Sequence, residues 1–294
     1  MFIPFGFAQK SLKTTLGRVV YYAPSAFWAE SADSVPLVFL HGFGGGSSAY
    51  EWSQVYPAFA VEHPVFAPDL PGWGRSEHPE RNYRPGDYIK CLGELLEQLS
   101  PQRPVVVIAS SLTAALIIRV AIEKPALFQG LILSAPAGIS DFGEAYGDNI
   151  FAKLVGTPIV DRLIYIAAIA TPGGITNFLQ NRQFTNSRRI YPEIIDAYLA
   201  SAQQSQAESA ALSFVRGDLC FDLATYLPRL TVPSAILWGE NAQLTSVQLG
   251  ERLASLNPQA IKCFDKLPNV GLTPQLEQPA LTIGLIRKYL KLLT

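Results

Sequence analysis

Short apolar segments that alternate with helical segments constrain the fold of this chain more than any other feature. The segments Val35–Leu40, Val105–Ala109 and Gly130–Pro136 carry no charge, which is typical of strands that are buried on both faces of a parallel sheet. Residues 87–99 and 112–123 instead place apolar side chains at helical spacing. We therefore expect an α/β fold with a mostly parallel central sheet that is flanked by helices.

The pattern changes between residues 137 and 230. This segment has no clear strand, only helical patterns that proline and glycine separate. We therefore expect a core that is built from residues 1–136 and 231–294, with residues 137–230 inserted between two strands as a helical cap. The helices expected in this cap are at 163–170, 191–199 and 210–214. Further core strands are expected at 17–22, 64–70, 234–238 and 260–264, and further core helices at 247–256 and at the end of the chain.

The composition excludes several classes of protein. Hydrophobic residues make up 49% of the chain and charged residues only 16%, so a disordered or linker protein is excluded. The net charge of −1 leaves no basic excess for a nucleic-acid partner. The low charged fraction indicates either a large core or an apolar surface that meets a ligand, a partner or a membrane.

Targeting signals are weak. The start of the chain, residues 1–7, is apolar but shorter than the core of a secretion signal, and no apolar stretch is long enough to span a bilayer. Three widely spaced cysteines do not form a disulfide framework. We expect a soluble, cytoplasmic protein without a transmembrane segment. Peripheral membrane contact through the N-terminus or the cap remains open.

Glycines and small polar residues follow three of the predicted strands. They form the segments His41–Gly46, Asp69–Ser76 and Ala109–Thr113. In an open parallel sheet, ligands bind beyond the carboxyl ends of the strands. Glycine allows backbone N–H groups to approach a ligand closely, and successive N–H groups can bind an anion. The sequence therefore predicts a site where these three segments meet.

These motifs, taken in order, resemble those of the α/β-hydrolase superfamily. The shared pattern is HG-x-GG, D-x-P-G-x-G-x-S, small-x-Ser-x-small, WGE, and a last strand followed by NVG. The resemblance implies that Ser111 occupies the nucleophile elbow and that the backbone N–H groups of Phe43 and Leu112 form the oxyanion hole. Ala109 and the bulkier Thr113 stand where the superfamily has glycine. Within the superfamily, the chain is similar to uncharacterised members from cyanobacteria and plastids.

The other two members of the catalytic triad depart from the superfamily pattern. The resemblance places the triad acid at position 242 and the triad histidine at position 272, where this chain has Ala242 and Leu272. The chain has three histidines, and none of them follows His78. A serine hydroxyl needs a neighbouring base, and loss of the histidine costs about a million-fold in kcat in a well-studied serine protease. We therefore expect a degenerate triad in which Ser111 is vestigial or non-standard, as in a pseudoenzyme.

Our leading hypothesis is a protein that binds an apolar small molecule or a protein partner in a pocket and does not hydrolyse esters. The residues expected to line this pocket are His41, Gly42, Ser110, Ala242 and Leu272. With two apolar residues at the triad positions, the pocket favours a hydrophobic guest.

Two other hypotheses involve catalysis. One is an enzyme of altered mechanism, such as a lyase, cyclase, isomerase or acyltransferase, which uses the oxyanion hole with His41, His78 or Asp141 as acid or base. The other is an ordinary esterase or lipase. Glu240, two positions before Ala242, is a further candidate acid, and His63 is interpreted as a solvated turn residue.

No cofactor or metal is expected. The histidines and cysteines lack metal-ligand spacing, and the sequence has neither a dinucleotide fingerprint nor a phosphate-binding loop. Serine rather than aspartate at position 111 also argues against the dehalogenase and epoxide-hydrolase branches.

Overall fold

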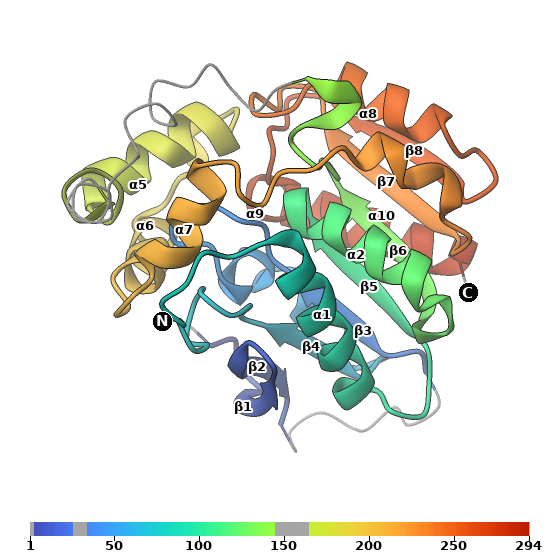
Figure 1. Ribbon diagram of the computed structural model, residues 1–294, viewed down its shortest axis with the longest axis horizontal. Coiled ribbons are helices and arrows are strands. Elements are labelled where there is room, and N and C mark those ends of the chain that lie inside the picture. The colour runs from blue at the N-terminus through green and yellow to red at the C-terminus, as the bar shows by residue number, and fades with distance from the viewer. Residues whose placement is uncertain (1–2, 26–33, 145–164, 294) are drawn as a thin grey trace.

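An eight-stranded sheet forms the centre of the described structure (Figure 1). This computed structural model describes residues 3–25, 34–144 and 165–293. The strands lie in the order β1-β2-β4-β3-β5-β6-β7-β8, and those from β3 to β8 pair in parallel. The expected α/β class with a mostly parallel sheet is confirmed. The strands are β1 (Phe7–Thr14), β2 (Gly17–Pro24), β3 (Leu37–Leu40), β4 (Val65–Pro68), β5 (Val105–Ser110), β6 (Phe128–Ser134), β7 (Ser234–Gly239) and β8 (Ile261–Leu267).

Helices cover both faces of this sheet. In Figure 1, α1 and α2 lie in front of the sheet and α10 lies behind it. Alternate residues of β5 join two separate clusters: Val107 packs in the cluster that includes α1 and α2, whereas Ile108 packs in the cluster that includes α10. Burial on both faces explains why the central strands carry no charge. The α-helices of the described chain are α1 (Pro85–Leu99), α2 (Ser111–Glu123), α5 (Pro172–Phe178), α6 (Pro192–Ala202), α7 (Glu208–Val215), α8 (Val247–Ser255), α9 (Pro274–Glu277) and α10 (Pro279–Leu293).

The N-terminal edge of the sheet differs from the sequence expectation. Sequence periodicity indicates one strand at 17–22, whereas the structure has an antiparallel hairpin of β1 and β2 in which Thr14 pairs with Gly17. Most of β1 is exposed or half-buried at the edge of the sheet, so this strand has no apolar pattern to reveal it. The other edge strand, β8, continues to Leu267, beyond the expected end at residue 264. Its last part was not expected to be strand, because it includes the charged residues Asp265 and Lys266.

Helices α5, α6 and α7 lie between β6 and β7 in the chain and gather at one side of the molecule, coloured yellow to ochre in Figure 1. Helices α6 and α7 cover the segments expected at 191–199 and 210–214. Of the helix expected at 163–170, the structure describes 165–169 as a π-helical turn, and residues 163 and 164 lie outside the described residues.

Helix α5 was not expected, because Pro172 and the two glycines that follow it resemble helix breakers. Proline is tolerated at the first helical position, where its missing N–H would have no intrahelical acceptor. The Thr171 side chain accepts a hydrogen bond from the Gly174 N–H at 3.0 Å and caps the helix. Proline here starts the helix.

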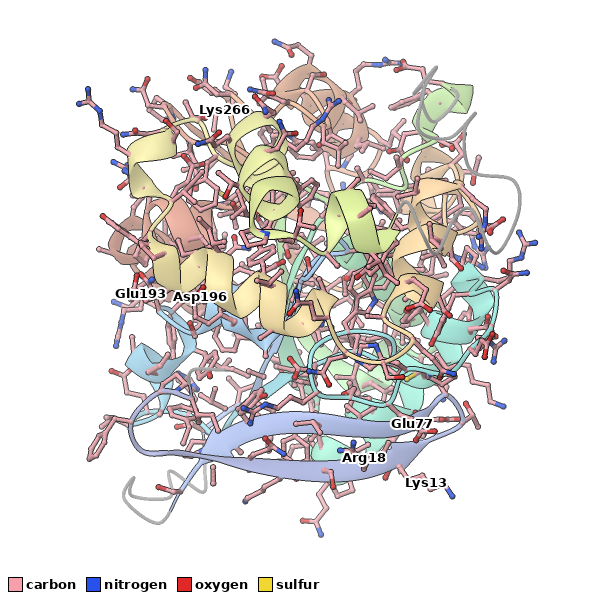
Figure 2. All side chains as sticks on the ribbon, turned by 90° about the vertical axis from the view of Figure 1, so that its left-hand side faces the viewer. Lys13, Arg18, Glu77, Glu193, Asp196 and Lys266 are labelled. Carbon is pink, nitrogen blue, oxygen red and sulfur yellow. The ribbon has the colours of Figure 1, made fainter. Side chains whose placement is uncertain are left out.

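Helix α6 has one face toward the body of the protein and one toward solvent. Ile194, Ala197 and Tyr198 are buried. Glu193 and Asp196 are exposed, and Figure 2 shows them on the outer face of the helix. The cap segment therefore packs on the body through an amphipathic helix.

Candidate functional site

Ser111 lies at the sharp turn between β5 and α2. Its backbone has φ +54°, in the left-handed region that residues other than glycine rarely adopt. Such a conformation costs about 1–3 kcal/mol and persists only where the surrounding structure imposes it. Ala109 and Thr113, on either side of this turn, are fully buried. None of the described residues forms a hydrogen bond with Ser111 Oγ.

Gly42, which follows β3, lies directly against this turn. A Cβ atom on Gly42 would lie 3.5 Å from Ser111 Cβ and 3.4 Å from Ser110 Oγ. The carboxyl ends of β3 and β5 are therefore adjacent, as the pairing of these strands requires. The glycine-rich segment and the serine turn, which the sequence analysis singled out separately, meet here.

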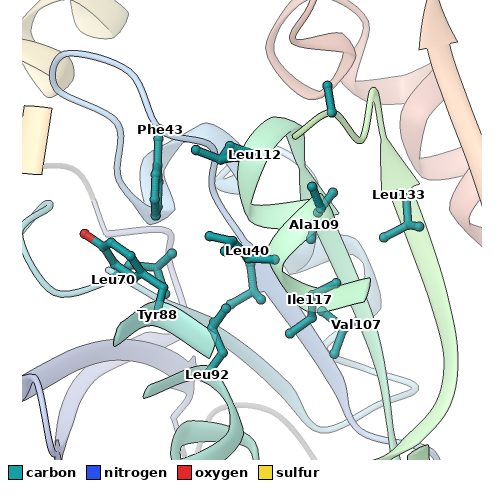
Figure 3. Packing of buried hydrophobic residues seen from close by; sticks show 14 of the residues in the cluster. Leu40, Phe43, Leu70, Tyr88, Leu92, Val107, Ala109, Leu112, Ile117 and Leu133 are labelled. Carbon is teal, nitrogen blue, oxygen red and sulfur yellow. The ribbon is translucent and has the colours of Figure 1, made fainter. Parts of the chain in front are cut away.

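Two backbone N–H groups flank the serine turn. The Phe43 ring stacks on Trp73 with ring centroids 5.2 Å apart and packs against Tyr88 at 4.6 Å, and Figure 3 shows Phe43 and Leu112 on neighbouring segments. The Phe43 N–H has no hydrogen-bond acceptor among the described residues. The Leu112 N–H lies in the first turn of α2, where no intrahelical acceptor exists. These are the two donors that the resemblance assigns to an oxyanion hole.

Both ring nitrogens of His41 are occupied by backbone groups. The Leu70 N–H can only donate, so His41 Nε2 accepts from it at 3.0 Å, and Nδ1 donates to the Gly42 carbonyl at 2.7 Å. The side chain is fully buried, and this burial lowers the pKa of His41 from 6.5 to about 4. His41 is thus a neutral imidazole that joins the segments after β3 and β4.

The other two histidines, His63 and His78, also form hydrogen bonds with backbone carbonyl groups and not with Ser111. His78 Nε2 donates to the Gly74 carbonyl at 3.1 Å, and burial lowers the pKa of this side chain. His63 Nδ1 bonds to the Val35 carbonyl at 2.9 Å. Because the chain has three histidines and all of them are described, no imidazole forms a hydrogen bond with Ser111.

Neither of the two candidate acids, Asp141 and Glu240, forms a hydrogen bond with Ser111. Asp141 accepts hydrogen bonds from the N–H groups of Gly138, Ile139 and Leu223, and burial raises its pKa from 3.8 to about 6. Its carboxylate therefore holds the loop after β6 against the segment that leads to β7. Glu240 is exposed at the end of β7.

Apolar contacts surround the two positions that the resemblance assigns to the triad. Leu272 is buried in the main hydrophobic cluster, and its N–H donates to the Gln183 carbonyl at 2.8 Å. Ala242 is half-buried against the same cluster. Glu277 secures the neighbouring loop by accepting from the Gly271 N–H at 2.6 Å.

Sequence reasoning missed Glu51, a fully buried carboxyl group beside the serine turn. Its Oε2 accepts from the Gly42 N–H at 3.0 Å, and its Oε1 lies 3.1 Å from the hydroxyl of Tyr198 on α6. The Tyr198 hydroxyl also donates to Gln183 Oε1 at 2.9 Å. Burial raises the pKa of Glu51. The only sequence signal was an acidic residue between two aromatic residues, Tyr50 and Trp52.

A cavity of about 360 Å³ lies between the cap segment and the glycine-rich segment. Gly44, Gly45 and Trp73 contribute the body side of its lining. The cap side includes Ile175, Phe178 and Phe214, with Asn177 and Arg182 as the polar members. The lining includes none of the five residues that were expected in a pocket, which are His41, Gly42, Ser110, Ala242 and Leu272. Ser111 is not part of the lining either.

Close approach of the cap explains the glycines beside this cavity. A Cβ atom on Gly44 would lie 2.9 Å from Phe178 Cζ, and one on Gly45 would lie 2.8 Å from Ile169 Cγ2. Real Cβ atoms do not come so near to other atoms, so larger residues at these two positions would require the Phe178 and Ile169 side chains to shift. The glycines thus let the cap rest directly on the backbone.

Within the described residues, no three histidine, cysteine or acidic side chains gather in a way that could hold a metal ion. No helix in the same part of the chain is long and apolar enough to cross a bilayer.

The fold, the serine turn and the glycine-rich segment define the class of this protein, and the sequence comparison agrees. The chain belongs to the alpha/beta hydrolase family, whose sequence model matches residues 37–285. The superfamily inferred from the motifs is confirmed.

Curated relatives match over most of their length. The chain is 28% identical to the uncharacterized hydrolase YugF of Bacillus subtilis over 262 residues, which cover 87% of this chain and 89% of YugF. It is 20% identical over 258 residues to the 2-hydroxy-6-oxo-6-(2'-aminophenyl)hexa-2,4-dienoic acid hydrolase of Metapseudomonas resinovorans, which cover 86% of this chain and 82% of that enzyme.

Solved structures share the fold. The serine hydrolase CarC, involved in carbazole degradation, superposes with a TM-score of 0.77 at 17% identity and covers 97% of this chain and 99% of its own. The carboxylesterase CesB (YbfK) of Bacillus subtilis has a TM-score of 0.76 at 17% identity and covers 98% of this chain and 92% of its own. At these identities the likeness shows the fold alone, and function must be argued from the site.

Proposed function

We propose that this chain is a binding protein on an α/β-hydrolase fold, which holds an apolar small molecule beneath its cap and does not hydrolyse esters through a serine–histidine–acid triad. One observation carries the proposal: all three histidines of the chain form hydrogen bonds with backbone carbonyl groups, and none bonds to Ser111. The hydroxyl at the turn therefore has no imidazole to accept its proton.

The size of the missing contribution makes ordinary hydrolysis untenable. Removing the base of a serine protease triad costs about a million-fold in kcat, and the remainder, about a thousandfold or more over water, comes from the oxyanion hole and binding. The backbone N–H groups of Phe43 and Leu112 could supply a residual rate enhancement of this kind, but it would be far below the rate of a working esterase.

The residues at the triad positions support the same proposal. Ala242 and Leu272 pack against the hydrophobic core rather than presenting polar groups to Ser111. A cavity with a mostly apolar lining is available beneath the cap, within the range of volumes of small-molecule sites.

Ester turnover tests the proposal directly. Purified protein and its Ser111→Ala variant would be assayed with 4-nitrophenyl acetate and 4-nitrophenyl butyrate. We expect equal, near-background rates from both, because the serine is not activated. Ser255→Ala, which changes an exposed serine at the end of α8, controls for contaminating esterases. A kcat of about 1 s⁻¹ or more that disappears only in Ser111→Ala would overturn the proposal.

Cavity contents provide an independent test. Native mass spectrometry of the freshly purified chain, followed by extraction into organic solvent, would show whether a small molecule accompanies the protein. The proposal expects an apolar or amphipathic molecule at a fixed ratio to protein. A polar metabolite in its place would contradict it.

A further inference from the structure

The cavity beneath the cap is apolar on nearly every side. Trp73, Ile175 and Phe214, which face it from the body and from two cap helices, are all largely buried. Side chains of this kind gain free energy by contact with hydrocarbon and offer no hydrogen bonds to a polar guest. The interior of this cavity therefore suits an alkyl chain or a comparable apolar group.

The lining of this cavity also has a polar part. Asn177 and Arg182 contribute the polar part of the lining, and both side chains are exposed. No described residue forms an ion pair or a side-chain hydrogen bond with Arg182. An arginine without a partner presents a planar fork of donors that matches a carboxylate or a phosphate. Among the described residues, the cavity lining thus carries one arginine whose positive charge no acidic side chain pairs with.

We infer that the ligand is a single-chain amphiphile with an anionic head group, whose chain occupies the cap cavity and whose head group binds Arg182. This inference rests on the proposed function, because it names the ligand class for the same cavity. Ser111 is not part of the lining, so binding does not require its hydroxyl. The shared chemistry, one alkyl chain and one anion, could come from a fatty acid or from a phosphate-headed lipid.

Binding of defined probes tests the inference. Trp73 lines the cavity, so its fluorescence would report occupancy, and calorimetry would give the affinity. The probes are butanoate, hexanoate, octanoate and decanoate, with decan-1-ol as the neutral analogue and decyl phosphate as the second anion. We expect affinity to rise about fourfold per added methylene until the chain fills the cavity. The affinities of decanoate and decyl phosphate then show whether the site prefers the carboxylate of a fatty acid or the head group of a phosphate-headed lipid.

Variants separate the head group from the chain. Arg182→Gln should weaken decanoate binding about three- to tenfold, as expected for a charge-assisted pair at an exposed site, and leave decan-1-ol unchanged. Arg188→Gln, an exposed arginine of the same segment outside the lining, should change neither. Ala211→Phe places a ring at the cavity wall and should weaken all chain-bearing probes more than tenfold, with thermal unfolding as the check on folding.

The outcomes distinguish this inference from the proposed function. Equal affinities for decanoate and decan-1-ol, with no effect of Arg182→Gln, would overturn the anionic head group while leaving an apolar binding protein in place. Failure of every chain-bearing probe to bind would overturn the amphiphile altogether. Ester turnover that depends on Ser111 would instead refute the proposed function, whatever the probes do.

Discussion

His41 should make the stability of this protein depend on pH in a predictable direction. Burial lowers its pKa in the folded chain from 6.5 to about 4, whereas the unfolded chain keeps the ordinary value. Between these two values the unfolded state binds more protons than the folded state, so the stability contributed by neutral His41 is complete above pH 6.5 and is lost as the pH falls toward 4. The gap between the two pKa values corresponds to about 3 kcal/mol.

The substitution His41→Gln isolates this contribution. The glutamine amide has no titratable group but can still accept from the Leu70 N–H. Urea unfolding of both proteins at several pH values from 4 to 8 would give the difference in their free energies of unfolding. We expect this difference to move by about 3 kcal/mol in favour of the wild type between pH 4 and pH 7.

Two buried acids act in the opposite direction. Burial raises the pKa values of Asp69 and Asp141 from 3.8 to about 6, so their contribution to stability falls as the pH rises through that window. Both acids are present in the wild type and the variant, so they cancel in the difference. Parallel stability profiles for the two proteins, or an imidazole NMR signal of His41 that titrates near 6.5, would refute the reasoning.

Three further comparisons of variants test other features of the site. Ser111→Gly should be about 1 kcal/mol more stable than Ser111→Ala in urea unfolding, because φ +54° is costly for alanine, and equal stabilities would show that the turn is not strained. Gly46→Ala should cost about 2–4 kcal/mol, because its Cβ would lie 2.3 Å from the Tyr198 carbonyl oxygen at φ +92°, whereas Gly86→Ala, with nothing within 4 Å, should cost nothing measurable. Ala242→Asp combined with Leu272→His should raise 4-nitrophenyl butyrate hydrolysis about a hundredfold or more, and reversion on adding Ser111→Ala would verify the source. No gain in a folded double variant would mean that positions 242 and 272 do not face the serine.

The sequence predicted the parts of the fold that depend on local pattern. The central strands were visible because both of their faces are buried, so β5 is a continuous apolar run. The turn at Ser111 was predicted from the resemblance to the superfamily's nucleophile elbow, although Thr113 is bulkier than the glycine of that pattern. Strand β1 was not visible, because an edge strand that is mostly exposed has no apolar period, and α5 was hidden by the proline that begins it.

The cavity and the buried acid could not be predicted in the same way. Glu51 contacts Tyr198, which lies 147 positions further along the sequence. Gly44, in the body, lies against Phe178 of the cap segment. Such contacts arise from how the cap segment docks, which no periodicity encodes. The residues that the resemblance placed at the pocket are therefore those of shared motifs, whereas those that line the cavity come mainly from the inserted segment.

The contact between Glu51 and Tyr198 makes the charge of one buried carboxyl group depend on how α6 is seated on the body. While α6 rests on the body, burial favours the uncharged form of this carboxyl group. Exposing Glu51 to water by lifting α6 would bring its pKa down toward that of an ordinary glutamate, so the carboxyl group would lose its proton more readily. A higher pH would therefore favour the arrangement in which α6 is lifted from the body, and a lower pH the arrangement in which α6 is docked.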